Sequence, residues 1–297
     1  MTYYTHVYDI AVGDFPTACE NFTKLTGVEG IPQWEGYSGG HDGMHFPVGG
    51  LSTLGLLAPV AGSSDATSQA IERLIARRGD CGFLLGFSVK NLERTIEDLA
   101  ARHVRHTEPW RVGDEVIIRT KPICGVSAVF AEHDDGHWEE WFRGKLRNKS
   151  VTPPAVTTRH HVLGTLAIEY ATSDLARSTD AFSALLGETP KPVTGPTGGA
   201  VTCYEFPLIG AQKLRVYGQG GGFSQFREQR IARVVEKFGD QLMSICFEVE
   251  STADSQLELE GLGFEFEAPS PVEEGGVITC ATLPVHGVAF EYVQAGP

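Results

Sequence analysis

The sequence predicts an α+β protein built as a tandem repeat of two domains, each formed by two βαβββ modules in a cupped mixed sheet with helices outside. Three observations predict this class. The chain matches itself without gaps at an offset of 160 residues (174 minus 14, for Asp14 on Asp174). Each half runs through the same order of strand-like and helix-like stretches. A segment containing Pro153-Pro154 separates the halves.

The repeat is visible in long stretches of sequence. "HFPVGGLSTLGLLAP" (45–59) aligns with "EFPLIGAQKLRVYGQ" (205–219), and "IERLIARRGDCGFLLGFSV" (71–89) aligns with "IARVVEKFGDQLMSICFEV" (231–249). A chance match would not keep one register over most of both halves. We therefore expect an N-terminal domain at 1–137, a linker at 138–160 and a C-terminal domain at 161–297.

The elements of the first half follow in order along the chain. "THVYDIAVGD" alternates and reads as a strand, and "DFPTACENFTKLTG" is a helix with an Asp cap, an early Pro and a final Gly. Two strands, "GMHFPV" and "LSTLGLLAP", precede a helix around 66–78. The second module repeats the scheme in "GFLLGFSV", the helix "NLERTIEDLAARH", and the strands "EVIIRTKPI" and "VSAVFAE".

Composition excludes several classes of function. The formal net charge of −14 argues against binding to nucleic acid or to anionic membrane surfaces. Six cysteines show no CxxC or zinc-type spacing, which favours reduced, mostly buried thiols. The N-terminus lacks a basic region followed by an apolar run, so we expect no signal peptide and a cytoplasmic protein.

The helix starts "DFPTACENFTKLTG" and "DLARSTDAFSALLG", the stretch "ARRGDCGFLLGFSVKNL" and the closing strand "HGVAFEYVQ" resemble the vicinal oxygen chelate superfamily. This superfamily includes glyoxalase I, extradiol dioxygenases, methylmalonyl-CoA epimerase and bleomycin-resistance proteins. The resemblance implies a cup in which His and Glu from first and last strands bind a metal. The matching first-strand positions are Val7, Leu84, Ala167 and Ser244, and the last-strand positions are Gly55, Ala131, Arg215 and Glu291. Only Glu291 fits the pattern.

Strand alternation predicts a charged cup in the C-terminal half. Burial of a charged side chain without a partner would cost several kcal/mol, so the charged residues of this cup should be paired or functional. One interpretation is an ion-pair network with Arg215 opposite Glu291. The other is a site with a carboxylate base, in which crowded carboxylates raise one another's pKa and Arg215 or Tyr217 stabilises an oxyanion. Its predicted catalytic residues are Glu291, Arg215, Tyr217, Glu169 and Glu248, and its predicted substrate contacts are Glu205, Ser244 and Cys246.

The N-terminal cup is predicted to contain fewer charged side chains than the C-terminal cup. Asp9, His41 and His45 are further candidates for substrate binding, with a histidine as acid or base that Asp9 orients. The alternative is that both histidines are ordinary surface residues of a hairpin. A β-bulge at His6 could turn that side chain inward as a metal ligand beside Glu291. The Gly-rich segment 218–229 lacks the ending of a phosphate loop and is predicted to be a flap over the C-terminal cup or a connector.

Three hypotheses on function follow from these patterns. The first is a small-molecule enzyme of this superfamily without the usual His/Glu metal site, which performs acid–base isomerisation or lyase chemistry on an oxygenated organic substrate. The second is a metal-dependent dioxygenase or glyoxalase-type enzyme with unusual ligands. The third is a ligand-sequestering protein of the bleomycin-resistance kind. The first expects no cofactor and the second a divalent metal; a homodimer is a further expectation.

Overall fold

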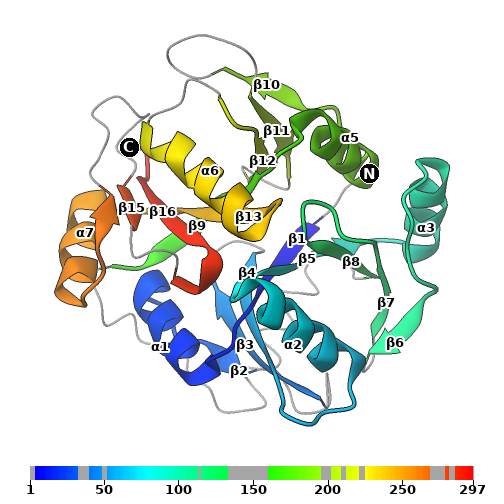
Figure 1. Ribbon diagram of the computed structural model, residues 1–297, viewed down its shortest axis with the longest axis horizontal. Coiled ribbons are helices and arrows are strands. Elements are labelled where there is room, and N and C mark those ends of the chain that lie inside the picture. The colour runs from blue at the N-terminus through cyan, green and yellow to red at the C-terminus, as the bar shows by residue number, and fades with distance from the viewer. Residues whose placement is uncertain are drawn as a thin grey trace.

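The computed structural model describes ten stretches of the chain (Figure 1). The predicted linker lies outside them except for its last residue, His160, and the Gly-rich segment is described only in part. No helix in these stretches is long and apolar enough to cross a membrane. The described stretches are 4–32, 40–48, 52–112, 115–132, 160–194, 202–208, 212–220, 225–267, 278–280 and 285–296.

The first half forms one eight-stranded mixed sheet in the order β2-β3-β4-β1-β5-β8-β7-β6. The first strand, β1, lies at its centre, parallel to β4 and antiparallel to β5. This arrangement places the first strands of the two modules side by side. The strands are β1 (Tyr4–Ala11), β2 (Ile31–Pro32), β3 (His41–Pro47), β4 (Thr53–Pro59), β5 (Cys81–Val89), β6 (Trp110–Val112), β7 (Glu115–Arg119) and β8 (Ser127–Glu132).

The second half repeats this sheet in the order β10-β11-β12-β9-β13-β16-β15-β14, so the prediction of two cupped mixed sheets is confirmed. A short 3₁₀ helix, η2 (Val285–Gly287), precedes the last strand. The strands are β9 (Val162–Ala171), β10 (Lys191–Val193), β11 (Cys203–Pro207), β12 (Lys213–Tyr217), β13 (Gln241–Val249), β14 (Phe266–Glu267), β15 (Ile278–Cys280) and β16 (Ala289–Gln294).

The pairing register refines the repeat. Asp9 lies beside Gly55, and Glu169 lies beside Arg215, as the offset of 160 requires. In the last strand the register moves by two residues. Cys246 lies beside Glu291, whereas its counterpart Gly86 lies beside Val129, an offset of 162 (291 minus 129). The offset of 160 would align Phe130 with Phe290, but the sheet register aligns it with Tyr292. The gap-free match is therefore wrong by two residues in the last strand, although the shift keeps each side chain on its predicted face.

Six helices complete the described fold: α1 (Phe15–Thr26), α2 (Ala66–Arg78), α3 (Leu92–Ala101), α5 (Leu175–Leu186), α6 (Gln225–Phe238) and α7 (Thr252–Gly261). The side chain of Asp14 caps α1 at the backbone N–H of Thr17, and Asp174 caps α5 in the same way. Both helices end at a glycine in the left-handed region, Gly27 and Gly187, which a residue with a Cβ adopts at a cost. The local signals read from the sequence thus set both helix boundaries.

Four helices, α1, α3, α5 and α7, cover the outer faces of the sheets and share one hydrophobic core across both halves. Phe22 of α1 packs edge-on against Phe290 of β16, with ring centroids 5.2 Å apart. His160 is buried, and one of its ring nitrogens lies 2.8 Å from the carbonyl oxygen of Leu25. The first helix of one half thus closes the core of the other.

The helices α2 and α6 pack on the opposite, inner faces. Ile71 of α2 is buried against Ala11, Leu57 and Phe83 of the first sheet. In the second half, Ile231 and Val234 of α6 are buried against a group that includes Ala171, Tyr217 and Met243. In Figure 1, α6 crosses in front of the second sheet. Each cup is therefore covered at one end by a helix of its own half.

Candidate functional site in the C-terminal cup

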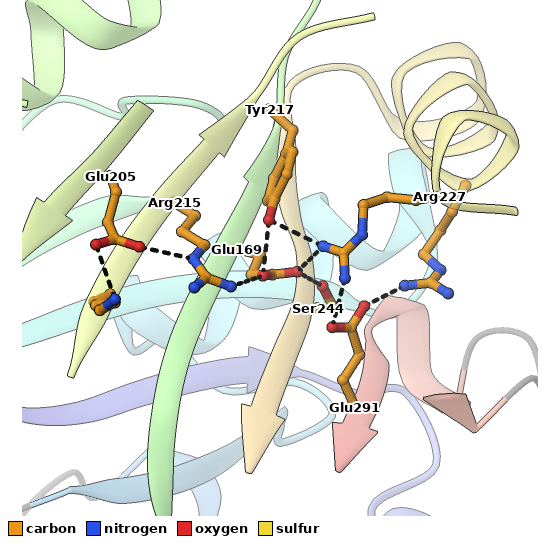
Figure 2. A network of polar contacts seen from close by, with 9 residues as sticks. Glu169, Glu205, Arg215, Tyr217, Arg227, Ser244 and Glu291 are labelled. Carbon is orange, nitrogen blue, oxygen red and sulfur yellow. Dashed lines mark hydrogen bonds and ion pairs between the residues drawn. The ribbon is translucent and has the colours of Figure 1, made fainter. Parts of the chain in front are cut away.

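Glu169, in the middle of β9, lies at the centre of a polar network (Figure 2). Its neighbours in the sheet are Arg215 on β12 and Ser244 on β13. Arg215 Nη1 and the Tyr217 hydroxyl donate to Oε1 over 3.3 and 3.2 Å. Arg227 Nη1 and the Ser244 hydroxyl donate to Oε2 over 3.1 and 2.6 Å. Four donors thus satisfy a carboxylate whose side chain has no exposed surface.

Glu291, on β16, is the second buried carboxylate. Arg230 Nη1 lies 2.5 Å from its Oε1, and Arg227 Nη2 lies 3.0 Å from its Oε2. Both arginines belong to α6, the helix that covers this end of the cup, and Figure 2 shows Arg227 projecting from it. The partner of Glu291 is therefore α6 and not Arg215, which the sequence analysis had placed opposite it.

Arg215 forms the open side of the network. Its Nε donates to Glu205 Oε2 over 3.1 Å, and Lys213 Nζ lies 3.0 Å from Glu205 Oε1. Exposure increases from Glu169 outwards, with the side chains of Glu205, Arg215 and Lys213 16%, 25% and 43% exposed. Among the described residues, none accepts a hydrogen bond from Arg215 Nη2. A guanidinium fixed on two sides therefore keeps one nitrogen free for an acceptor at this edge.

The network fixes the charges of its members. Burial alone would raise the pKa of Glu169, but Arg227, Arg215 and the Ser244 hydroxyl together lower it. Burial and the nearby Glu169 raise the pKa of Tyr217 well above its usual value, so this phenol keeps its proton. The expectation that crowded carboxylates raise one another's pKa is therefore wrong for Glu169, because guanidinium groups lie between the carboxylates.

Arg227 and Arg230 were missed by reasoning from the sequence. At the offset of 160 they align with Thr67 and Ala70 of the first half, where the cup carries no second carboxylate on its last strand. Two basic residues three apart on a helix lie on one face. Their appearance only in the half that carries Glu291 was the available signal.

The other predicted residues of this cup take different places. Cys246 is buried beside Glu291, and burial together with Glu291 raises the pKa of its thiol, which keeps it protonated. Glu248 is half-buried two residues further along β13, and among the described residues no ion pair joins it to the network. The structure thus brings Glu169, Arg215, Tyr217, Ser244, Glu205 and Glu291 together and leaves Glu248 aside.

The N-terminal cup holds a simpler set of polar groups. Asp9 is buried, and burial raises the pKa of its carboxyl to about 7. His45 is also buried, and His41 Nδ1 lies 3.7 Å from Asp65 Oδ1 with only 8% of its side chain exposed. The interpretation of both histidines as surface residues is therefore wrong. The register of β1 is irregular between Thr5 and Val7, where the sequence analysis expected a bulge at His6; the His6 side chain lies outside the described part.

The residues present do not offer the metal ligands that the superfamily resemblance implies. Beside Glu291, the corresponding positions carry Ala167, Ser244 and Arg215, and guanidinium nitrogens contact both Glu291 oxygens. A cation would have to displace Arg227 and Arg230. Within the described residues, no three His, Cys, Asp or Glu side chains group as metal ligands.

Solved structures resemble this fold over the whole chain. A triple mutant of 4-hydroxymandelate synthase from Streptomyces coelicolor superposes with a TM-score of 0.62 at 11% identity, over 100% of this chain and 94% of that one. The Mn(II)-bound glyoxalase from Novosphingobium aromaticivorans gives 0.58 at 11% identity, over 98% and 83%. The chain has the vicinal oxygen chelate fold. A fusion of a xylose isomerase-like TIM barrel with 4-hydroxyphenylpyruvate dioxygenase gives 0.59 at 14% identity, over 99% of this chain and 49% of that one.

At such identities the likeness establishes the vicinal oxygen chelate fold and leaves the reaction to be argued from the site. No protein-family model matches the sequence, and a comparison with curated proteins gives no match.

Proposed function

We propose that the chain is a small-molecule enzyme that uses the C-terminal cup of a vicinal oxygen chelate fold for acid–base isomerisation or lyase chemistry without the usual His/Glu metal site. One observation carries the proposal. Arg215 is held at Nε and Nη1 by two carboxylates, while Nη2 has no acceptor among the described residues. A preorganised donor of this kind binds a carboxylate and stabilises the oxyanion that forms when a neighbouring C–H loses its proton.

The network suggests a division of roles. Glu169 is saturated by donors and has a lowered pKa, which makes it a poor base and a good support for Arg215. Glu205 is the most exposed of the three network carboxylates and lies between Arg215 and Lys213, so we assign it as the base. Tyr217 keeps its proton and orients Glu169. Glu291 holds α6 over the cup through Arg227 and Arg230.

The test is proton exchange in D2O. The full chain is incubated with a panel of small 2-oxo and 2-hydroxy carboxylates, and deuterium at C3 of the 2-oxo acids and at C2 of the 2-hydroxy acids is followed by NMR. We expect exchange with the wild type, loss of at least tenfold with Arg215→Lys or Glu205→Gln, and no change with Arg111→Lys, an exposed arginine of the first half. Exchange that survives both cup substitutions would refute the proposal.

A ligand-sequestering protein is the second candidate. Hydrogen-bond donors already contact the carboxylates of Glu169 and Glu291, which makes both of them poor bases. A carboxylate that binds through Arg215 but is recovered unchanged and without deuterium would favour it. A stoichiometric transition metal in the purified protein, with activity lost on its removal, would instead favour the dioxygenase or glyoxalase alternative.

A further inference from the structure

Asp9, in the N-terminal cup, is a buried carboxyl group that accepts no hydrogen bond from the part of the chain that the structure describes. Only 8% of the residue is exposed, and none of the described residues donates to its Oδ1. Desolvation by burial raises its pKa, and among the described residues no nearby cation compensates for it. A buried carboxyl that lacks a partner costs stability, and such groups concentrate at functional sites.

In the second half, the residue that corresponds to Asp9 is Glu169, and it has cationic partners. There Glu169 and Glu205 flank Arg215 in the sheet, and its guanidinium binds both carboxylates. In the first half, Asp9 and His45 flank Gly55 in the same register. The first cup therefore keeps an acid at the Glu169 position but lacks the arginine side chain that neutralises it.

Gly55 brings the side chains of Asp9 and His45 to one point of the cup. A Cβ at Gly55 would lie 1.9 Å from Asp9 Oδ1 and 3.5 Å from His45 Nδ1, so both groups converge where the arginine side chain would begin. Leu84, beside Asp9 on β5, is half-buried and not sealed from solvent.

We propose that Asp9 and His45 form a second binding site, specific for an organic cation of the guanidinium class, which takes the place that the Arg215 guanidinium occupies in the second half. The ligand's N–H groups donate to the Asp9 carboxylate as charge-assisted hydrogen bonds. The planar donor set of a guanidinium matches a carboxylate better than a single ammonium group does. This site is independent of the chemistry proposed for the C-terminal cup.

Titration of Asp9 gives the site a pH signature. Its pKa of about 7 means that the carboxylate needed for binding is a minor form at pH 5.5 and the major form at pH 8.5. Gly55 and Leu84, the residues beside Asp9 in the sheet, do not titrate, and among the described residues the His45 ring on β3 is the titratable side chain that approaches the same point over Gly55.

The experiment uses n-propylguanidinium, which reproduces an arginine side chain from its Cβ, and measures binding to the full chain by calorimetry at pH 8.5 and 5.5. We expect saturable binding at one site, at least tenfold weaker at the lower pH and at least tenfold weaker for Asp9→Asn. Asp42→Asn, which removes an exposed acid from the same half, should bind as the wild type does. Gly55→Arg should abolish binding, because the chain then supplies its own guanidinium.

Three results would overturn the proposal. Equal affinity for the wild type and Asp9→Asn would mean that the cation binds elsewhere. No binding at millimolar probe would mean that the site does not exist. Tighter binding of Mn²⁺ or Mg²⁺ than of the probe, lost in Asp9→Asn, would make it a metal site. Should Gly55→Arg fail to fold, the comparison of Asp9→Asn with Asp42→Asn still decides the matter.

Discussion

Arg227 Nη2 lies 3.0 Å from Glu291 Oε2, which ties the first turn of α6 to the last strand of the second sheet. The other terminal nitrogen of the same guanidinium reaches Glu169 on the central strand. One arginine thus bridges two buried carboxylates from strands β9 and β16. Its removal would leave negative charge in a region shielded from water, where desolvation makes an unpaired charge costly.

We therefore expect Arg227→Met to destabilise the protein by about 3 kcal/mol, within the range typical for breaking a buried ion pair. The measurement is urea unfolding at pH 7. Arg233→Met, which removes an exposed arginine from the same helix, should cost less than about 0.5 kcal/mol. Equal effects of the two substitutions would show that Arg227 is not a structural cation of the cup.

Protonation of Glu169 at low pH should weaken the ion pairs of the C-terminal cup. Its pKa is lowered in the folded protein relative to the ordinary value of 4.5, so its ion pairs stabilise the fold above that pH. This contribution is lost as pH falls below about 4.5 and through the lower folded value. Glu169→Gln should be destabilised at pH 7, and its deficit relative to the wild type should shrink in acid. Glu20→Gln, at a glutamate 68% exposed, should show no such pH dependence. A constant deficit from pH 7 to 3 would contradict this account.

The two halves should unfold together. Phe22 of α1 lies against Phe290 of β16 and against Phe46 of its own half, with ring centroids 5.2 and 5.9 Å apart. Truncation of a buried Phe to Ala costs about 3 to 5 kcal/mol. We expect the whole chain to unfold in one calorimetric transition, and we expect Phe22→Ala to lower the temperature of that transition. Two separate transitions, with only the first-half transition shifted, would show that the halves are thermodynamically independent.

How far the sequence predicts this protein depends on whether the signal is local. Asp14 and Gly27 mark the ends of a helix because capping and left-handed backbone are local properties. The same residues recur at Asp174 and Gly187, which indicates the tandem repeat. Strand alternation gave the inward direction of Glu169 for the same reason. The contacts of Glu291 could not be found in this way. They depend on where α6 packs relative to the sheet, which no local pattern specifies.

Asp9 provides a prediction whose sign is opposite to that of Glu169. Burial raises its pKa from 3.8 to about 7, so the neutral form stabilises the fold fully below pH 4, and this stabilisation is lost as pH rises through 7. A shift of this size corresponds to about 4 kcal/mol at most. Asp9→Asn cannot ionise, so without ligand it should be about 2 to 4 kcal/mol more stable than the wild type at pH 8.5, with the gain disappearing near pH 4. Urea unfolding at both pH values measures the gain. Asp42→Asn serves as the exposed control, and a stability gain for Asp9→Asn that is the same at both pH values would contradict the assignment of a buried, ionising carboxyl.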